Sequence, residues 1–275
     1  MNEHEIRQRL GKYSFYHTIR LTERVSTAGM PEAIELVNLT LPILHELDLR
    51  GKRVLDIGCR DGLFCFEAER MGAREVIGID NDPSPGALEF LIPFFESKVK
   101  MHELNVYDLR PATFGIFDVV LFPGVLYHLR HPFWALKQIA GVLRDGGLLL
   151  LETAVLVDDN RHAMLFCPVG ADSPYEPTSC TFFNTKGLVD TLRSFGLPMM
   201  TFRYLENAHM RAAPSDGRVV VDRVAMVCQS APWVIDKSVA RYWFGTHRIH
   251  SAQHEDIYAS EHNPNPPSPS APVHQ

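Results

Sequence analysis

From residue 52 onward, short apolar segments alternate with amphipathic ones, and this alternation restricts the possible fold more than any other feature of the chain. We predict strands at the apolar segments 53–59, 75–80, 99–106, 117–122, 148–156, 200–206 and 217–229. Helical spacing of apolar residues occurs between them, in segments 62–72, 87–97, 132–147 and 184–196. Such alternation is typical of a parallel sheet covered by helices. We therefore expect an α/β fold with a doubly wound, Rossmann-like sheet of seven strands.

Three regions are expected along the chain. Residues 1–50 contain two helical patterns, 5–19 and 31–47, and are expected to form an N-terminal helical cap. Residues 51–245 are expected to form the main domain. Within it, the irregular stretch after the fifth strand is predicted to be a lid insertion. Residues 246–275 are rich in proline and have little to bury, which predicts a disordered tail.

The composition narrows the class of protein. The 275-residue chain is 45% hydrophobic and 22% charged, which is ordinary for a soluble globular protein. It shows neither an apolar run long enough to span a membrane nor an apolar signal core. The five cysteines are odd in number and no pair has Cys-x-x-Cys spacing, which indicates reduced thiols. We expect a cytoplasmic protein with no membrane partner and no metal.

The segment VLDIGCRDG (Val54–Gly62) is typical of a ligand-binding turn between a strand and a helix. Such turns commonly carry a glycine where this chain has Arg60. A dinucleotide site needs Gly-x-Gly-x-x-Gly, because the backbone must approach a pyrophosphate closely. Counted from Gly58, that pattern would place glycines at Arg60 and Leu63, so it fails twice. We expect Arg60 to adopt a backbone conformation open to residues with a Cβ atom, and its side chain to face solvent or to pair with Asp61 or Glu67.

S-adenosylmethionine (SAM) fits the segment better, because it carries no phosphate. Asp80 ends the second strand and is expected to bind the ribose hydroxyls, while Asp56 is expected to organise the loop and the methionine ammonium group. Asn105 is expected to accept a hydrogen bond from the adenine amine beside the Val106 backbone. These residues map to the carboxyl ends of the strands, where open α/β sheets bind ligands. The candidate cofactor-binding residues are Asp56, Gly58, Cys59, Arg60, Gly62, Asp80, Asn81, Asn105, Val106 and Pro123.

Several segments together resemble class I SAM-dependent methyltransferases. They are FYHTIRL (15–21), GKRVLDIGCRDGLFCFEAERMGA (51–73), FDVVLFPGVLYHLRHP (117–132) and LLLLET (148–153). More narrowly, the chain is similar to the tRNA 5-methoxyuridine methyltransferase-like family, which is related to the tRNA wobble-uridine carboxymethyltransferase. In that related enzyme the tyrosine of the GVLYH motif helps to bind the carboxylate of carboxy-SAM, and Tyr127 matches this position. The same enzyme uses a lysine within a Gly-Pro-Phe segment, which this chain lacks, so the resemblance favours ordinary SAM over carboxy-SAM.

The sequence thus leaves three functions open. The first is methyl transfer from SAM to a small aromatic or heterocyclic metabolite. The second is modification of a tRNA wobble uridine, which the net charge of −6 disfavours because tRNA phosphates demand clustered cations. The third is SAM binding without catalysis. For the first, His128 is expected to act as general base or to orient the substrate, Tyr127 to line the methyl or methionine pocket, and His17 to contact the substrate.

Overall fold

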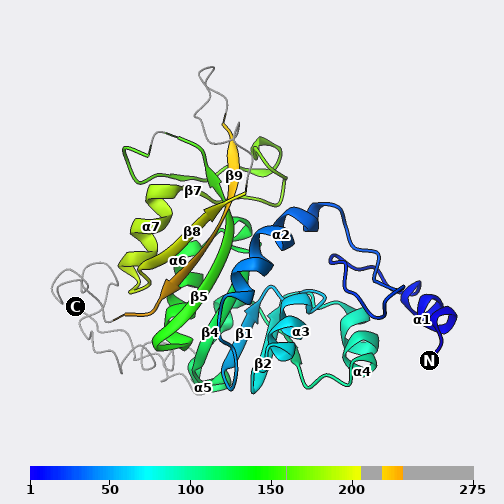
Figure 1. The fold of residues 1–275 in the computed structure, drawn as a ribbon. Coiled ribbons are helices and arrows are strands. Elements are labelled where there is room, and N and C mark those ends of the chain that lie inside the picture. The colour runs from blue at the N-terminus through cyan, green and yellow to red at the C-terminus, as the bar shows by residue number, and fades with distance from the viewer. Residues whose placement is uncertain (159, 206–218, 232–275) are drawn as a thin grey trace, which may run out of the picture.

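The computed structural model describes residues 1–158, 160–205 and 219–231. The predicted tail at 246–275 and the end of the predicted main domain lie outside these residues. Within them, the chain forms one mixed sheet of nine strands with helices on both faces (Figure 1). The strands are β1 (Arg53–Ile57), β2 (Glu75–Asp80), β3 (Lys100–Glu103), β4 (Phe117–Pro123), β5 (Leu143–Leu156), β6 (Leu165–Phe166), β7 (Phe182–Asn184), β8 (Met199–Tyr204) and β9 (Val221–Gln229).

The strand order is β3-β2-β1-β4-β5, and the long strand β5 then pairs with two partners. Antiparallel β9 runs along residues 148–156 of β5 and carries β8 on its other edge, whereas β7 pairs in parallel only with the carboxyl end of β5. The strands from β1 to β5 are all parallel to one another. The chain order reverses between β1 and β4, which creates the switch point where doubly wound sheets bind ligands. The predicted fold class is confirmed.

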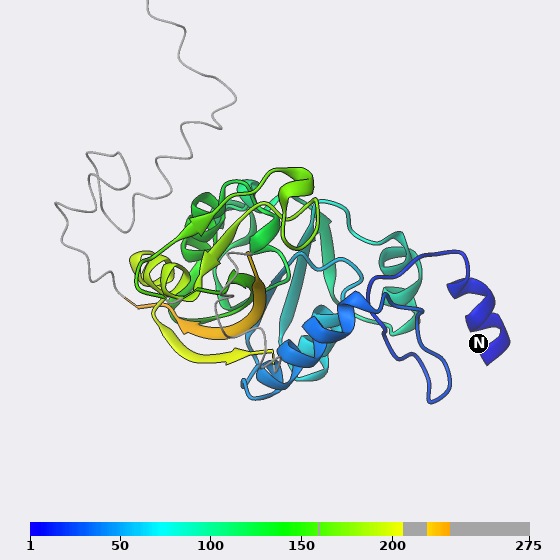
Figure 2. The same cartoon turned by 90° about the horizontal axis from the view of Figure 1, so that it is seen from above.

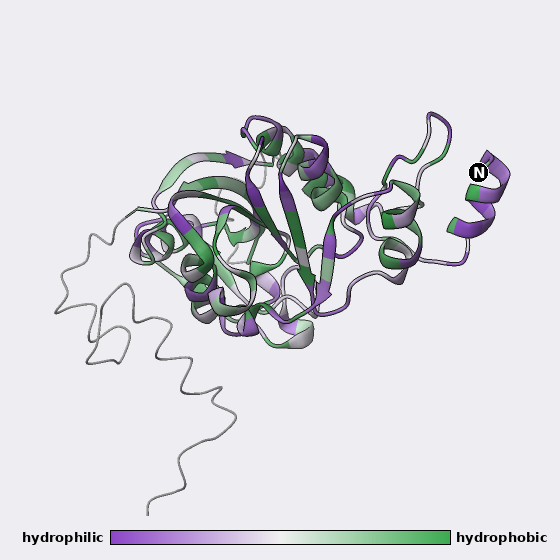
Figure 3. Cartoon of the chain, turned by 90° about the horizontal axis from the view of Figure 1, so that it is seen from below, coloured by the Kyte–Doolittle hydropathy of each residue, from purple (hydrophilic) through white to green (hydrophobic). Residues whose placement is uncertain are grey.

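Two helical layers cover the sheet, because successive strand residues point to opposite faces. The helices are α1 (Glu3–Leu10), α2 (Glu32–His45), α3 (Leu63–Arg70), α4 (Ile92–Phe94), α5 (Pro111–Phe114), α6 (Pro132–Val142) and α7 (Thr185–Ser194), with the π-helix η1 (Ala87–Leu91) and the short 3-10 helices η2 (Val106–Asp108), η3 (Leu126–His128) and η4 (Gly170–Asp172). Val54 belongs to the apolar cluster under α2 and α3, and the next residue, Leu55, belongs to the cluster under α6 and α7. Figure 2 shows the sheet between these layers, and Figure 3 shows hydrophobic residues along its central strands.

The N-terminal residues share the core of the sheet. Ile6, Leu10 and Phe15 belong to the same buried cluster as residues of α2, α3 and the strands. The helix predicted over 5–19 is wrong beyond Leu10: α1 ends there, and the chain after Gly11 runs irregularly to α2. The reason is a tertiary contact, because the backbone N–H groups of Tyr16 and His17 donate hydrogen bonds to Asp61 instead of to a helical carbonyl.

The structure differs from the predicted elements in three further places. The helix predicted over 87–97 is split into η1 and α4, because Pro93 has no N–H to continue the helical hydrogen bonds. The helix predicted over 132–147 ends at Val142, where β5 begins five residues earlier than expected and pairs with β4. The stretch 157–181 contains β6 and η4, and β7 follows it directly.

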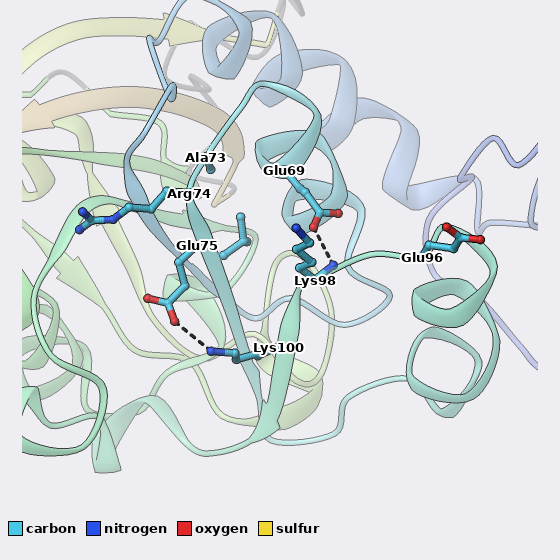
Figure 4. Close-up of a pocket in the computed structure, with 8 residues that line it drawn as sticks. Glu69, Ala73, Arg74, Glu75, Glu96, Lys98 and Lys100 are labelled. Carbon is cyan, nitrogen blue, oxygen red and sulfur yellow. Dashed lines mark hydrogen bonds and ion pairs between the residues drawn. The ribbon is translucent and has the colours of Figure 1, made fainter.

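A hollow of about 670 Å³ lies at the amino end of β2, away from the switch point. Figure 4 shows that Lys100 pairs with Glu75 and that the backbone N–H of Lys98 donates to Glu69. Its charged residues are Glu69, Arg74, Glu75, Glu96, Lys98 and Lys100, three acids and three bases. This balance of charge gives the hollow no preference for an ion of either sign.

Gly78, in the middle of β2, provides a test of the packing. A Cβ atom there would lie 2.8 Å from Sγ of Cys59 and 2.9 Å from Sγ of Cys65. We expect Gly78→Ala to lower the free energy of unfolding by about 1–3 kcal/mol, measured by urea denaturation, because the buried thiols must move. Gly141→Ala is the control, because a Cβ atom at this position in α6 meets nothing within 4 Å. Equal stability of the two variants would contradict this packing.

Candidate active site at the carboxyl edge of the sheet

A cavity of about 640 Å³ opens at the carboxyl ends of the parallel strands. The ends of β1, β2 and β4 and the turn after β3 form its walls, and Tyr16, His17 and Glu176 reach it from outside the sheet. Ten of the thirteen predicted site residues line it: His17, Gly58, Arg60, Asp80, Asn81, Asn105, Val106, Pro123, Tyr127 and His128. The topology brings these residues together because parallel strands end at the same edge.

Three predicted cofactor-binding residues do not line the cavity. Asp56 is fully buried and accepts a hydrogen bond from the Cys65 thiol, with Sγ and Oδ2 3.1 Å apart. Cys59 is buried and faces Gly78 in β2. Gly62 has φ +80° and closes the turn by donating its N–H to the carbonyl of Cys59 at 2.7 Å. The turn places the side chains of Asp56 and Cys59 in the core, so any role of these three residues at a ligand stays a prediction.

The backbone of Arg60 also differs from the expectation. Its φ is +40°, in the region that favours glycine. The conformation is held by hydrogen bonds at both ends of the residue: its N–H donates to Oδ2 of Asp80 at 2.9 Å, and its carbonyl accepts from the N–H of Ser84 at 3.0 Å. Its guanidinium pairs with Asp82 rather than with Asp61 or Glu67. Arginine thus keeps the glycine-like turn, and these contacts offset the backbone strain.

The turn after β1 is attached to the end of β2. The N–H groups of Gly58 and Cys59 both donate to the carbonyl of Ile79, at 2.8 and 3.2 Å. Gly58 has φ +78°, and a Cβ atom there would overlap the Val125 side chain. Glycine at this position is therefore required by the close approach of the loop after β4 as well as by the backbone.

Two candidate ligand-binding side chains, those of Asp80 and Asn105, already accept hydrogen bonds from backbone N–H groups. The Asp80 carboxylate accepts from the N–H of Arg60 through Oδ2 and from the N–H of Asp82 through Oδ1, at 2.8 Å. Oδ1 of Asn105 accepts from the N–H of Tyr107 at 3.0 Å and caps η2. Each oxygen has a second lone pair for a ligand, and the amide nitrogen of Asn105 remains a donor. The backbone contacts fix the orientation of both side chains at the cavity wall.

Asp61 holds the N-terminal segment over the cavity, a role that sequence reasoning did not assign. Its Oδ2 accepts from the backbone N–H groups of Tyr16 and His17, at 2.6 and 2.7 Å, and lies 3.4 Å from Nδ1 of His17. Burial opposes ionisation of Asp61, but the hydrogen bonds from His17 prevail and lower its pKa. The sequence signal that could have indicated this role is an acidic residue inside a tight turn. This anchor places Tyr16 and His17 at the cavity.

Tyr127 contacts a buried ion pair that the sequence did not predict. The Arg223 guanidinium makes a two-pronged contact with Glu152, at 2.7 and 2.9 Å. It also donates to the hydroxyl groups of Tyr175 at 2.6 Å and Tyr127 at 3.4 Å, and lies over the Tyr127 ring. Burial raises the pKa of Tyr127, so its hydroxyl stays protonated at neutral pH. The pairing of β5 with β9 brings Glu152 and Arg223 together, and no local sequence pattern predicts this contact.

His128 faces a carboxylate across the cavity wall. Its Nε2 lies 3.4 Å from Oε1 of Glu176, and its Nδ1 lies 3.4 Å from the carbonyl of Thr178. Burial lowers the pKa of His128, and the nearby Glu176 opposes that change. The stretch 157–181 is joined to this loop, since the N–H groups of Cys180 and Thr181 both donate to the carbonyl of Tyr127. The predicted lid therefore lies against the cavity and supplies Glu176 to it.

The described residues contain neither a helix able to cross a membrane nor a group of three metal-ligating side chains. All five cysteines are free thiols.

Comparison with known proteins identifies the domain. A family model described as a methyltransferase domain matches residues 4–201. The chain belongs to this methyltransferase family. Its match includes β1 to β7, the first half of β8 and every residue that lines the cavity.

Curated relatives match a smaller part of the methyltransferase chain than the family model does. The tRNA U34 carboxymethyltransferase of Marinobacter nauticus is 41% identical over 128 residues, which is 44% of this chain and 37% of that protein. The chain thus matches less than half the length of this curated relative. Among solved structures, the N-terminal domain of EvdMO1 with bound S-adenosylhomocysteine has a TM-score of 0.61 at 19% identity, covering 84% of this chain and 98% of that one. The Burkholderia thailandensis 1,6-didemethyltoxoflavin-N1-methyltransferase has a TM-score of 0.53 at 18% identity, covering 72% and 79%. These likenesses show the fold.

Asp56 predicts a pH dependence of stability. Burial raises its pKa from 3.8 to about 7 in the folded protein. Between these values the native state binds a proton that the unfolded state has released, so stability should fall as pH rises, by up to about 1.4 kcal/mol per pH unit. We expect Asp56→Asn to remove this slope in urea unfolding measured from pH 4.5 to 7.5. Parallel profiles for the variant and the wild type would refute the assignment, and Asp145→Asn on the exposed start of β5 is the control.

Proposed function

We propose that the protein transfers a methyl group from SAM to a small aromatic or heterocyclic metabolite. The observation that carries the proposal is the cavity at the switch point, which joins two groups of side chains. We call the residues Gly58, Arg60, Asp80, Asn81, Asn105, Val106 and Pro123 the donor half. We call Tyr16, Tyr127, His128 and Glu176 the acceptor half. Most of the donor half follows β1, β2 and β3, and most of the acceptor half follows β4 and β5.

The donor half fits SAM by its chemistry. Asp80 offers carboxylate oxygens to the ribose hydroxyls, and Asn105 offers both a donor and an acceptor to the adenine edge. A pyrophosphate is poorly served, because the Arg60 guanidinium is already paired with Asp82 and the turn lacks the three-glycine pattern. The solved methyltransferase-fold structures with bound S-adenosylhomocysteine support the same choice.

The acceptor half provides groups to position and deprotonate a substrate. Bound SAM supplies an electrophilic methyl group on a sulfonium centre. Methyl transfer then depends mainly on alignment of the acceptor atom, which aromatic walls such as Tyr16 and Tyr127 provide. Nδ1 of His128 faces a carbonyl, and in the tautomer that donates from Nδ1 to this carbonyl, Nε2 is the acceptor. His128 is therefore the proposed general base.

The relatives support a second candidate, modification of a tRNA wobble uridine with carboxy-SAM. Tyr127 occupies the position that the resemblance links to the extra carboxylate. The cation that contacts Tyr127, however, is Arg223, which is neutralised by Glu152. Arg223 would have to exchange Glu152 for the cofactor carboxylate. This pairing favours SAM, and the net charge of −6 favours an acceptor smaller than tRNA.

Mass spectrometry of small molecules released from the purified protein tests the proposal. We expect SAM or S-adenosylhomocysteine, and methyl transfer to a small acceptor that is unaffected by treating the preparation with RNase. Release of carboxy-SAM, or transfer that depends on tRNA, would establish the second candidate. Bound SAM without turnover on any acceptor would support a binding protein without catalysis.

Asp80→Ala tests the donor half quantitatively. Loss of a charge-assisted hydrogen bond to the ribose should raise the Kd for SAM at least tenfold in calorimetry, about 1.4 kcal/mol. Asp145→Ala, on the exposed start of β5, should bind SAM like the wild type. Because Asp80 also holds Arg60, thermal unfolding of both variants is measured in parallel. Unchanged SAM affinity in a folded Asp80→Ala protein would rule out the proposed ribose contact.

A further inference from the structure

His128 and Glu176 face each other in the acceptor half. Nε2 of His128 and Oε1 of Glu176 are 3.4 Å apart, and both residues line the cavity. The carbonyl of Thr178 lies 3.4 Å from Nδ1, so in the tautomer that donates from Nδ1 to this carbonyl the Nε2 lone pair faces the carboxylate. In that tautomer the two acceptors repel each other unless a hydrogen-bond donor from a ligand lies between them.

The surrounding residues hold this pair in place. Ser179 Oγ donates to the same Oε1 of Glu176 at 3.0 Å. The carbonyl of His128 accepts from the Cys180 thiol, and the carbonyl of Leu129 accepts from the Thr181 hydroxyl at 2.6 Å. The Ser179 hydrogen bond thus holds the Glu176 carboxylate, and the contacts of Cys180 and Thr181 hold the stretch 157–181 against the loop after β4.

We propose that Nε2 of His128 and the carboxylate of Glu176 form a two-acceptor site that binds the N–H or O–H group of the methyl acceptor and takes its proton. The substrate class is then a neutral molecule whose methyl-accepting nitrogen or oxygen carries a hydrogen, such as a heterocyclic N–H or a phenolic O–H. This inference rests on the proposed function and adds Glu176 as a second catalytic residue.

The proposed step forms two bonds and breaks two. The acceptor heteroatom forms its bond to the methyl carbon while the carbon–sulfur bond breaks and leaves its electron pair on sulfur. The N–H or O–H bond breaks at the same centre, and its electron pair stays on the heteroatom. The proton passes to Nε2 of His128, where the Glu176 carboxylate stabilises the imidazolium, and it is later released to water.

Other charged and titratable groups around His128 shape its protonation. Glu176 raises its pKa, whereas burial and the Arg223 guanidinium of β9 lower it. The Tyr127 ring lies 4.2 Å from the imidazole, centroid to centroid. The balance leaves the pKa below its ordinary value, so the ring can accept a proton at neutral pH.

The first test measures His128 directly in the full chain saturated with S-adenosylhomocysteine, by NMR of ¹³C- and ¹⁵N-labelled histidine. We expect a neutral ring at pH 7 with the proton on Nδ1, and the spectrum of His128→Gln identifies its resonances. Glu176→Gln should lower the pKa of His128 by at least 0.5 unit, because the neighbouring negative charge is lost. Glu96→Gln is exposed and outside the cavity, and should leave this pKa unchanged. A protonated ring at pH 7, or an unchanged pKa in Glu176→Gln, overturns the proposal.

The second test asks whether the pair recognises a donor. The probes are 2-naphthol and 2-methoxynaphthalene, which differ in the hydroxyl hydrogen, and binding to the same loaded protein is followed by ligand-observed NMR. We expect the wild type and Glu96→Gln to bind 2-naphthol at least fivefold more tightly, and Glu176→Gln to lose this preference. No preference in the wild type, or an unchanged preference in Glu176→Gln, overturns the inference. Failure of the protein to bind S-adenosylhomocysteine would instead overturn the proposed function.

Discussion

The attachment of the 58–62 turn to the end of β2 is the contact on which the cavity depends. Two N–H groups share the carbonyl of Ile79, and a third reaches the carboxylate of Asp80. Parallel pairing of β1 with β2 and β4 brings the strand ends together, but these hydrogen bonds decide how the turn crosses that edge. The same bonds hold Arg60 in a conformation usually reserved for glycine. The turn therefore keeps its shape without the usual glycine, through contacts to a neighbouring strand.

From this turn, a second anchor organises the opposite wall. Asp61 points away from the donor half and fixes the backbone of Tyr16 and His17. One short loop thus positions both the donor half, through Asp80, and part of the acceptor half, through the N-terminal segment. Oδ2 of this buried carboxylate accepts both backbone N–H groups, and the lowered pKa of Asp61 keeps it charged for that purpose.

The doubly wound sheet and the approximate positions of its parallel strands were predictable, because they follow from apolar periodicity and the rules of parallel connections. Ten predicted site residues line the cavity for the same reason. The differences from expectation concern side-chain direction and local dihedrals. Asp56 and Cys59 belong to the expected segment but are buried away from the cavity, and Arg60 has positive φ. Strand position alone does not determine which face of a turn meets a ligand.

The sequence by itself determined the doubly wound sheet, its switch point and the set of residues that gather there, because hydrophobic periodicity and chain connectivity are encoded locally. Only the tertiary structure decided the pairing of Glu176 with His128 and of Glu152 with Arg223. The first pair joins residues 48 apart in the chain, and the second joins β5 to β9 by antiparallel pairing. Such contacts have no periodic signature, since they form only when the completed sheet brings distant segments together.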